Sequence, residues 1–192
     1  MKKIGVLALQ GDFAAHEKAL ARLGVASVEI RETKQFNDID GLIIPGGEST
    51  VMLKLLRADQ LMEPLRAFIK VKPVFGTCAG AILLAKTVTG PAQESLGVMD
   101  MDVERNAYGR QRESQITEID LEPVSASHTG ANKMEAVFIR APIIRTIGPG
   151  VKVLARYQGN PVLVQQGHHM AATFHPELTN DLRVHKSFIE ML

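Results

Sequence analysis

Short continuous hydrophobic runs alternate with amphipathic segments along the first half of the chain. Unbroken apolar runs are typical of strands that are buried on both faces of a parallel sheet. We expect such strands at 4–9, 25–30 and 41–44, and the stretch 74–80 is expected to begin with a short buried strand and end in a sharp turn. Apolar residues at helical spacing predict helices at 12–23, 49–56 and 62–69, and a further helix directly after Cys78. This alternation of strands and helices favours an α/β fold.

The pattern changes after Gly97, where apolar and polar residues alternate. A period of two is typical of half-exposed antiparallel strands, and it is clearest at 98–103 and 115–121. Further strands are expected at 136–139, 151–155, 162–164 and 170–174. We expect a hairpin turn at 159–160 and a last helix that Asn180 caps. The prediction is a mostly parallel sheet that carries an antiparallel extension.

Length and composition narrow the class of protein. A chain of 192 residues can bury a sizeable core, and we interpret 1–192 as one domain. Cys78 is the only cysteine, so disulfides cannot contribute, which fits a reducing cytoplasm. The first apolar run stops at Gln10 and is too short for an export or membrane segment. With 22 basic and 21 acidic residues, the net charge of +1 gives no case for nucleic-acid or membrane binding.

Cys78 lies between two glycines, Gly76 and Gly80, at the junction of a predicted strand and helix. This pattern is typical of a nucleophile on a strained turn, where small neighbours let two chain segments pass closely. A helix N-terminus favours the thiolate, which is the form that attacks carbonyl carbon. The alternative is a small buried hydrophobe, which is the more common role of a lone cysteine. The flanking glycines favour the nucleophile.

His175 could act as a base for this nucleophile, and Glu177 could orient it. Side chains two residues apart at the end of a strand face the same side, so both should point at the sheet edge where Cys78 is expected. Pro176 stiffens the link between them. The alternative is a surface histidine and glutamate after a strand that Pro176 ends. Residues 175–177 indicate a catalytic base only in combination with the cysteine turn.

The glycine-rich segment 45–49 follows a predicted strand and could present backbone N–H groups to a developing oxyanion. Alternatively, it is an ordinary strand-to-helix loop that Ser49 caps. A phosphate-binding loop is disfavoured, because Gly47 and Glu48 stand where Lys and Ser or Thr are required.

The remaining polar clusters give weaker signals. His168 and His169 could suggest a metal, but neighbours on a strand face opposite ways and no second cysteine or nearby carboxylate completes a site, so we interpret them as structural. Three further histidines, interpreted as ordinary polar or helix residues, are His16, His128 and His185. Arg105, Asn106 and 109–112 could bind a carboxylate through guanidinium groups, or could form a solvated loop of balanced charge.

Taken together, 76–80 and 175–177 resemble the class I glutamine amidotransferases, whose Cys-His-Glu triad hydrolyses glutamine. Further stretches make the chain similar to the glutaminase subunits of the two-component pyridoxal 5'-phosphate synthases. These stretches are 5–11, 45–50, 104–111, 138–142 and 173–179. The resemblance extends over essentially the whole chain. It implies a three-layer α/β sandwich of the class I glutamine amidotransferase type.

This resemblance also implies a triad and a reaction. Cys78 would be the nucleophile, His175 the general base and acid, and Glu177 the residue that orients His175. L-glutamine would be hydrolysed to L-glutamate and ammonia through a glutamyl thioester, with no metal or organic cofactor. The ammonia would pass to a separate ring-forming synthase subunit that builds pyridoxal 5'-phosphate. We expect a cytoplasmic location, with no nucleic-acid or membrane partner.

The resemblance further implies an oxyanion site and a glutamine site. The backbone N–H groups of Ala79 and Gly47 would hold the oxyanion, and Gln10 is linked to ordering that site in this family. The implied glutamine-binding residues are Gly46, Gly47, Glu48, Arg105, Ile139 and Arg140. Two alternatives stay open. The chain could be the glutaminase subunit of another pathway, such as histidine synthesis, or a non-catalytic regulatory module on the same fold.

Overall fold

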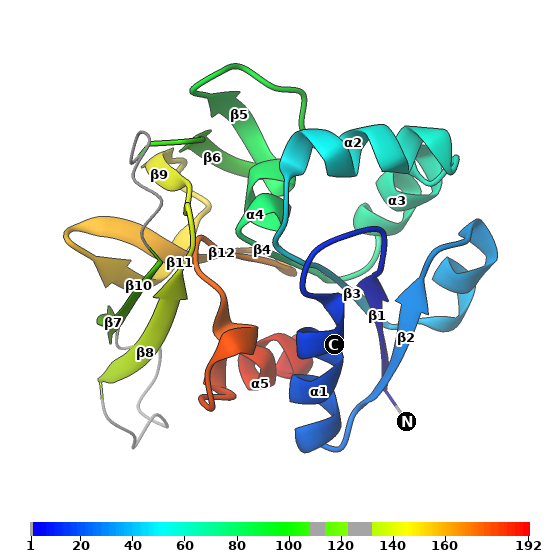
Figure 1. Ribbon diagram of the computed structural model, residues 1–192, viewed down its shortest axis with the longest axis horizontal. Helices are drawn as coiled ribbons and strands as arrows, with labels where there is room; N and C mark the ends of the chain where they lie inside the picture. The colour runs from blue at the N-terminus through cyan, green and yellow to red at the C-terminus, as the bar shows by residue number, and fades with distance from the viewer. Residues whose placement is uncertain (1, 108–113, 123–131) are drawn as a thin grey trace.

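Figure 1 shows the computed structural model of the chain, which describes residues 2–107, 114–122 and 132–192. Its centre is a sheet with the strand order β2-β1-β3-β4-β12-β11-β10-β7-β8. The first five of these strands are β2 (Ala26–Ile30), β1 (Lys3–Leu7), β3 (Gly41–Ile44), β4 (Val74–Thr77) and β12 (His169–Ala172). They run parallel to one another, as their continuous apolar runs predict. The strands β3, β4 and β12 are buried along their whole length.

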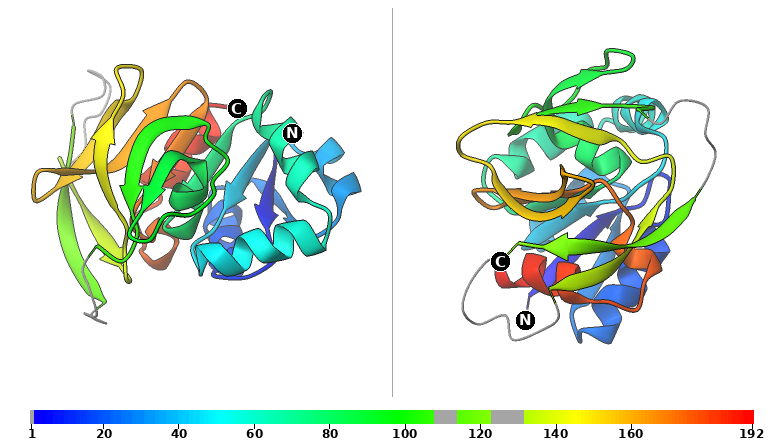
Figure 2. Two further views of the ribbon diagram at one scale, coloured as in Figure 1. Left: turned by 90° about the horizontal axis from the view of Figure 1, so that it is seen from above. Right: turned by 90° about the vertical axis from the view of Figure 1, so that its left-hand side faces the viewer.

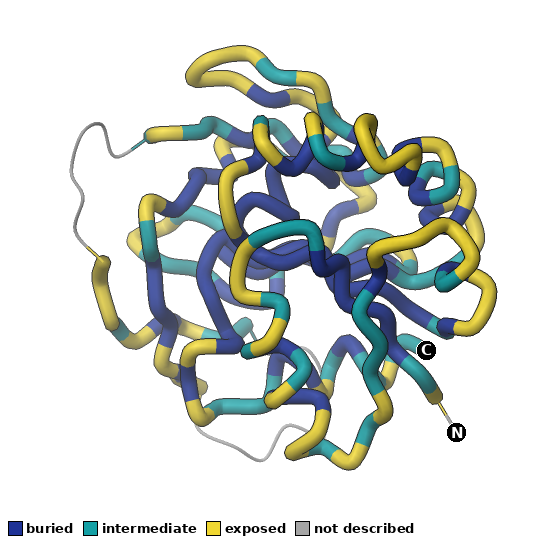
Figure 3. The backbone as a smooth tube through the Cα atoms, turned by 45° about the vertical axis from the view of Figure 1, so that its right-hand side comes forward, coloured by how far each residue is buried: buried dark blue, intermediate teal, exposed yellow. Residues whose placement is uncertain are grey.

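Helices cover both faces of this sheet, which gives the three expected layers (Figure 2). One face packs against α2 (Ser49–Ala58), α3 (Met62–Ile69) and α4 (Ala79–Leu84). The other face packs against α1 (Phe13–Arg22) and α5 (Arg183–Glu190). The core therefore divides into two apolar clusters, one on each face, and exposed loops and helix surfaces enclose both (Figure 3). Among the described residues, no helix is long and apolar enough to cross a membrane.

The remaining strands of the large sheet form the predicted antiparallel extension. They are β11 (Asn160–Gln166), β10 (Lys152–Tyr157), β7 (Gln115–Leu121) and β8 (Lys133–Phe138). The hairpin between β10 and β11 turns at Gln158 and Gly159, both with positive φ, one residue earlier than expected. Asn160 instead pairs with Tyr157 in the ladder. A two-residue turn of this kind needs positive φ at both central positions, which Gly159 adopts at little cost.

A second sheet of three strands lies beside the first and was not predicted. It contains β5 (Ala85–Thr89), β6 (Met99–Glu104) and β9 (Ile143–Ile147). The prediction of an antiparallel strand at 98–103 holds for one neighbour only, because β6 pairs antiparallel with β9 and parallel with β5. The strand β5 was missed because Ala85 continues the apolar run of α4. The backbone leaves the helix at this residue, with φ −61° and ψ 149°.

The helix α5 begins at Arg183, and the prediction that Asn180 caps it was wrong. Leu182 occupies the N-cap position and makes no side-chain cap. Asp181 Oδ1 accepts the backbone N–H of Arg183 at 3.0 Å, so a carboxylate close to the helix start takes the role expected of the amide. Asn180 Oδ1 instead accepts from Arg22 Nη1 of α1 at 3.4 Å. The polar segment between β2 and β3 forms a 3-10 helix, η1 (Thr33–Asp38).

Candidate active site

Cys78 lies on the sharp turn between β4 and α4, where the parallel strand β4 ends. Its backbone has φ 48° and ψ −102°, which is strained for a residue with a side chain. Two glycines allow the turn. A Cβ on Gly80 would lie 2.1 Å from the Ile44 carbonyl oxygen, and a Cβ on Gly76 would lie 2.5 Å from the Gly80 carbonyl carbon. The strained turn and the close passage of two chain segments are therefore both present.

His175 and Glu177 meet in a short 3-10 turn, η2 (Pro176–Leu178). His175 Nδ1 lies 2.8 Å from Glu177 Oε1, and both side chains are buried rather than at the surface. The two side chains were predicted to meet because they share one face at the end of a strand. This reason was wrong, because β12 ends at Ala172, before either residue. They meet because the backbone folds into the 3-10 turn, held by the His175 N–H that donates to the Val137 carbonyl oxygen at 2.8 Å.

The glycine loop after β3 brings the cysteine and the histidine together. A Cβ on Gly46 would lie 2.4 Å from His175 Cε1 and 3.3 Å from Cys78 Cβ. Both side chains therefore pack against the bare backbone of Gly46. Cys78 Sγ also lies 3.9 Å from the Ile139 carbonyl oxygen, which is a weak thiol contact. The residues predicted as nucleophile and base are thus neighbours in space.

The charge state of His175 is set by its neighbours. Burial acts against the imidazolium, yet the hydrogen bonds and charges of Cys78 and Glu177 together raise the pKa of His175 to about 10. His175 therefore carries a proton at neutral pH. An imidazolium held between a cysteine and a carboxylate favours a thiolate nucleophile and keeps a proton ready for a leaving group.

Ala79 and Gly47, which the sequence predicts as oxyanion donors, both lie near Cys78. Ala79 is the first residue of α4, directly after Cys78, and is fully buried. Gly47 lines the cavity in front of Cys78 and has φ 144°, a conformation that L side chains rarely adopt. Gln10 packs against Gly47, since a Cβ there would lie 2.8 Å from Gln10 Nε2, and this Nε2 donates to the Glu48 carbonyl oxygen at 2.6 Å. Gln10 thus supports the glycine loop without being among the residues that line the cavity.

A cavity of about 190 Å³ opens in front of Cys78 and His175. Five of the residues expected to bind glutamine line it, namely Gly47, Glu48, Arg105, Ile139 and Arg140. Arg105 Nη2 lies 3.4 Å from Glu48 Oε1, so a positive and a negative group stand side by side. Burial acts to raise the pKa of Glu48, but the hydrogen bonds from Thr50 and the charge of Arg105 outweigh it and lower that pKa. The Glu48 carboxylate is therefore charged at neutral pH.

Asp12, Ile82 and Pro142 also line this cavity and were missed as site residues. A carboxylate oxygen of Asp12 lies within 4.8 Å of both a His175 ring nitrogen and a Glu177 oxygen. These three side chains are the one group of possible metal ligands among the described residues, and two of them already hydrogen-bond each other. Asp12 follows β1, so its place after the carboxyl end of a parallel strand was the available signal.

Asn106 lines the same cavity as Arg105. The predicted carboxylate-binding cluster also included 109–112, and these positions lie outside the described residues, as does His128.

Two buried histidines lie behind Glu177; both are helix residues, as the interpretation allowed, but neither is an ordinary polar residue at the surface. His16 from α1 and His185 from α5 are both fully buried. His16 Nδ1 lies 2.9 Å from His185 Nε2, and His16 Nε2 lies 3.4 Å from Glu177 Oε2. Each histidine shares the buried face of its helix with an apolar residue, Leu20 in α1 and Phe188 in α5, so helical spacing was the available signal.

Lowering the pH is expected to destabilise the fold through these histidines. Burial, followed by the charges of His185 and His175, lowers the pKa of His16 well below 6.5, and burial lowers the pKa of His185 to about 4. The folded state therefore favours neutral imidazoles. Their contribution to stability is complete above pH 6.5 and is lost as the pH falls toward 4, by about 3 kcal/mol for His185.

The measurement is the free energy of unfolding in urea at pH 7, 5.5 and 4.5. We expect His185→Leu to flatten the decline below pH 6.5, because the group that must gain a proton is gone. Glu177 and His16 face the same buried space and stay in that variant. A decline as steep as that of the parent chain would contradict the expectation.

His168 and His169 lie at the start of β12, at the opposite end of that strand from His175. Their ring centroids are 4.2 Å apart, and His168 Nε2 lies 3.5 Å from the Ile69 carbonyl oxygen. Burial, followed by the charge of His168, lowers the pKa of His169 to about 4. The two histidines therefore belong to the edge of the sheet that lies away from Cys78.

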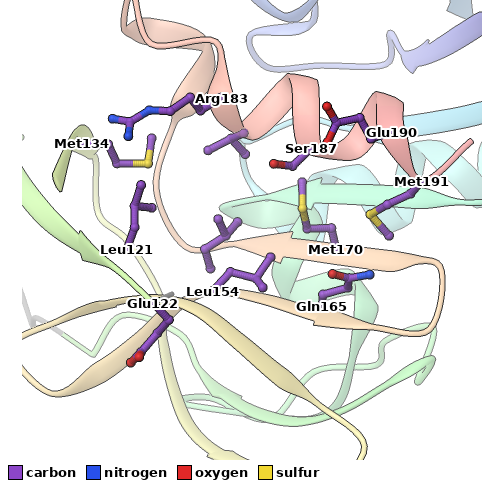
Figure 4. Close-up of a pocket in the computed structure, with 12 residues that line it drawn as sticks. Leu121, Glu122, Met134, Leu154, Gln165, Met170, Arg183, Ser187, Glu190 and Met191 are labelled. Atoms are coloured by element: carbon purple, nitrogen blue, oxygen red, sulfur yellow. The ribbon is translucent and has the colours of Figure 1, made fainter. Parts of the chain in front are cut away.

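A second cavity, of about 230 Å³, lies between α5 and the strands of the antiparallel extension (Figure 4). Methionine and leucine side chains make up much of its wall, among them Met134, Leu154, Met170 and Met191. The described residues that line it include no cysteine and no histidine. It is therefore separate from the cavity in front of Cys78.

The SNO glutamine amidotransferase family matches the chain over residues 6–192. The chain is 60% identical to the pyridoxal 5'-phosphate synthase subunit PdxT of Solibacter usitatus (strain Ellin6076), over 192 residues that cover 100% of both chains. It is 56% identical to the subunit PdxT of Koribacter versatilis (strain Ellin345), with 99% of this chain and 95% of that one covered. A crystal structure described as a glutamine amidotransferase matches with a TM-score of 0.87 at 46% identity, covering 98% of this chain and 97% of its own.

The layered α/β fold is thus that of a glutamine amidotransferase of class I type. The chain belongs to the SNO glutamine amidotransferase family. Both the fold class and the family resemblance expected from the sequence are confirmed.

Proposed function

We propose that this chain is the glutaminase subunit of a two-component pyridoxal 5'-phosphate synthase. The observation that carries the proposal is Cys78 on a strained turn, beside a His175 that the buried Glu177 holds. Membership of the family supports it, since the PdxT relatives are named as subunits of that synthase. We propose that residues 1–192 act as one glutaminase domain in the cytoplasm, where the thiol of Cys78 stays reduced.

The reaction begins with attack of the Cys78 thiolate on the side-chain carboxamide carbon of L-glutamine. A carbon–sulfur bond forms, and the carbonyl electrons move to oxygen. The backbone N–H groups of Ala79 and Gly47 stabilise this oxyanion, because donors held in place cost no reorganisation when charge develops. His175, protonated at neutral pH, then donates its proton to the amide nitrogen as the carbon–nitrogen bond breaks. Ammonia leaves, and a glutamyl thioester remains on Cys78.

The second half of the reaction releases glutamate. His175, now neutral, takes a proton from a water molecule that attacks the thioester carbon. The tetrahedral intermediate collapses and expels the thiolate of Cys78, and His175 is again an imidazolium. Glu177 keeps the imidazole in one orientation through both halves, since its Oε1 accepts from Nδ1 and leaves the other ring nitrogen for the reaction. The sum is glutamine plus water to glutamate plus ammonia.

The charged wall of the cavity suits the backbone end of a free amino acid. Glu48 offers a carboxylate for the α-ammonium group, and Arg105 and Arg140 offer guanidinium groups for the α-carboxylate. Ile139 adds its carbonyl group next to Cys78. Recognition of both charges would hold the side-chain amide at the thiolate.

Replacing Arg105 with methionine is expected to raise KM for glutamine about tenfold or more while changing kcat little. The reason is that the guanidinium binds the end of the substrate that does not react, and a hydrogen bond to a charged group contributes about 1.5–3 kcal/mol. Steady-state ammonia release measures both constants. Arg156→Met is the matched control, because Arg156 pairs with Glu122 on the antiparallel extension. An unchanged KM for Arg105→Met would contradict this role.

The test of the proposed function is release of ammonia and glutamate from L-glutamine by the purified chain, alone and with the ring-forming synthase subunit added. We expect equimolar products and a rate that rises on mixing. Activity that responds only to the synthase of another pathway would favour the alternative glutaminase. A reduced, folded chain that is inactive under every condition would favour the regulatory module.

A further inference from the structure

Glu177 has one carboxylate oxygen that the triad does not use. Its side chain is fully buried, and Oε1 accepts from His175 Nδ1. Among the described residues, Oε2 has no hydrogen-bond partner, and His16 Nε2 approaches it in an ion-pair contact at 3.4 Å. A buried carboxylate oxygen without a donor is strongly disfavoured. The proton on His16 therefore decides whether Glu177 is held by one contact or by two.

Two arrangements of protons are possible for the pair of neutral imidazoles. The contact between His16 Nδ1 and His185 Nε2 is 2.9 Å, so one of these nitrogens must donate to the other. If His16 donates, its Nε2 turns a lone pair toward Glu177 Oε2 at 3.4 Å, although the Thr77 hydroxyl at 3.2 Å can donate to that lone pair. In this arrangement an N–H is left at His185 Nδ1. That atom is buried and has no partner among the described residues. If His185 donates, His16 Nε2 carries a hydrogen toward Glu177 Oε2, and only a lone pair is left unpaired at His185. The second arrangement avoids both the repulsion between a lone pair and the carboxylate and the cost of a buried N–H without an acceptor.

We propose that His16 is a positioning residue for the triad, with its Nε2–H holding the second oxygen of Glu177 and with His185 Nε2–H holding His16. This inference rests on the roles proposed above for Cys78, His175 and Glu177. It adds a second support behind the orienting carboxylate, built from two helices on the same face of the sheet.

The same imidazole also contacts the strand that carries the nucleophile. His16 Nε2 lies 3.2 Å from Thr77 Oγ1, and Thr77 directly precedes Cys78. The ring of Phe75 stands edge-on to His16 with centroids 6.4 Å apart, and edge-on to His185 at 6.1 Å. Phe75 thus places an apolar ring against both histidines. His16 therefore links the end of β4 to η2.

Loss of the contact between His16 and Glu177 should lower the reactivity of Cys78 at low pH but not at high pH. Without a donor at Oε2, Glu177 can rotate, and its bond to His175 Nδ1 weakens. The imidazolium is then less favoured, and a neighbouring positive charge is what activates a cysteine nucleophile toward an electrophile. The groups that face His175 are Cys78 on the turn, Glu177 in η2, Asp12 before α1 and His16 in α1. Of these, Glu177 is the group that His16 approaches directly, at Oε2, and the contact of His16 with Thr77 reaches only the residue before Cys78.

The experiment is the rate of alkylation of the full-length chain by iodoacetamide, measured at pH 6 and at pH 10. Cys78 is the only cysteine, so the rate reports on one thiol. We expect His16→Asn to lower the rate at pH 6 about tenfold or more and to leave the rate at pH 10 unchanged, because any thiol is largely ionised there. Asparagine can still reach His185 but is too short to reach Glu177.

His16→Gln is the conservative variant, because its amide nitrogen can take the place of the imidazole Nε2. It should recover most of the rate at pH 6. His169→Leu, a buried histidine at the far end of β12, should leave both rates unchanged. Equal rates for His16→Asn and His16→Gln would overturn the proposal, as would a loss of rate of the same size at both pH values.

A double variant separates positioning from general damage. In a Glu177→Gln background, His16→Asn should cause no further loss at pH 6, since the carboxylate through which His16 acts is gone. A loss as large as in the parent chain would show that His16 does not act through Glu177. These measurements need no glutamine, so a chain that fails the test of glutaminase activity can still pass or fail this one.

Discussion

Cys78→Ala is expected to abolish glutamine hydrolysis, with a fall in kcat of about 10⁴ or more. The reason is that no other cysteine exists in the chain to form the thioester. The fold should be unaffected, because the thiol is small and its polar contacts, with His175 and with the Ile139 carbonyl oxygen, belong to the site. Ammonia release and the thermal unfolding midpoint, measured on the same preparation, check both parts of this expectation.

The variant should still bind glutamine, since Glu48, Arg105 and Arg140 are unchanged and line the cavity. Glutamine should therefore raise the unfolding temperature of Cys78→Ala. Ammonia release at the rate of the parent chain would show that the nucleophile lies elsewhere.

Gly46→Ala is expected to lower kcat about 10²-fold without unfolding the chain. The added methyl group would lie 2.4 Å from His175 Cε1, so the imidazole must move away from Cys78. A displacement of about 1 Å in a reacting group typically costs a factor of this size. The backbone of Gly46 has a φ that alanine can adopt, so the effect is steric rather than one of backbone strain.

Gly150→Ala is the matched control for this effect. Gly150 also has an ordinary φ, and a Cβ there would meet only Gln166 Nε2, at a normal contact distance of 3.4 Å. Both the activity and the unfolding temperature of Gly150→Ala should stay close to those of the parent chain. If Gly46→Ala is as active as Gly150→Ala, then the imidazole does not need the position seen against the glycine loop.

The pattern of apolar and polar residues along the chain predicted those elements whose local sequence matches their burial in the fold. The strands β3 and β7 and the helix α3 have the predicted bounds, because each is a continuous or periodic apolar segment closed by polar residues, Gly or Pro. The turn at Cys78 was also predictable, since the glycines at positions 76 and 80 mark it in the sequence. Gly76 is required by contacts within the strand-turn-helix unit, and Gly80 by its contact with Ile44 of β3. The roles of the individual site residues stay predictions.

Features that depend on distant segments were missed. His16 and His185 are 169 residues apart and meet only because α1 and α5 pack on the same face of the sheet. The 3-10 turn at His175 depends on a hydrogen bond to β8, and the second sheet depends on β9 returning beside β6. Spacing along the chain contains no information about these contacts, because each is fixed by tertiary packing.

The most direct test of a Cys78-dependent supply of ammonia uses glutamine labelled with ¹⁵N at the amide nitrogen. The measurement follows this nitrogen through the assembled synthase. With the chain and the ring-forming subunit present, we expect ¹⁵N in the ring of the pyridoxal 5'-phosphate produced. With Cys78→Ala, labelled product should form only when ¹⁵N-ammonium is supplied instead of glutamine. Unlabelled product from the parent chain, or labelled product from Cys78→Ala with glutamine, would contradict a Cys78-dependent supply of ammonia.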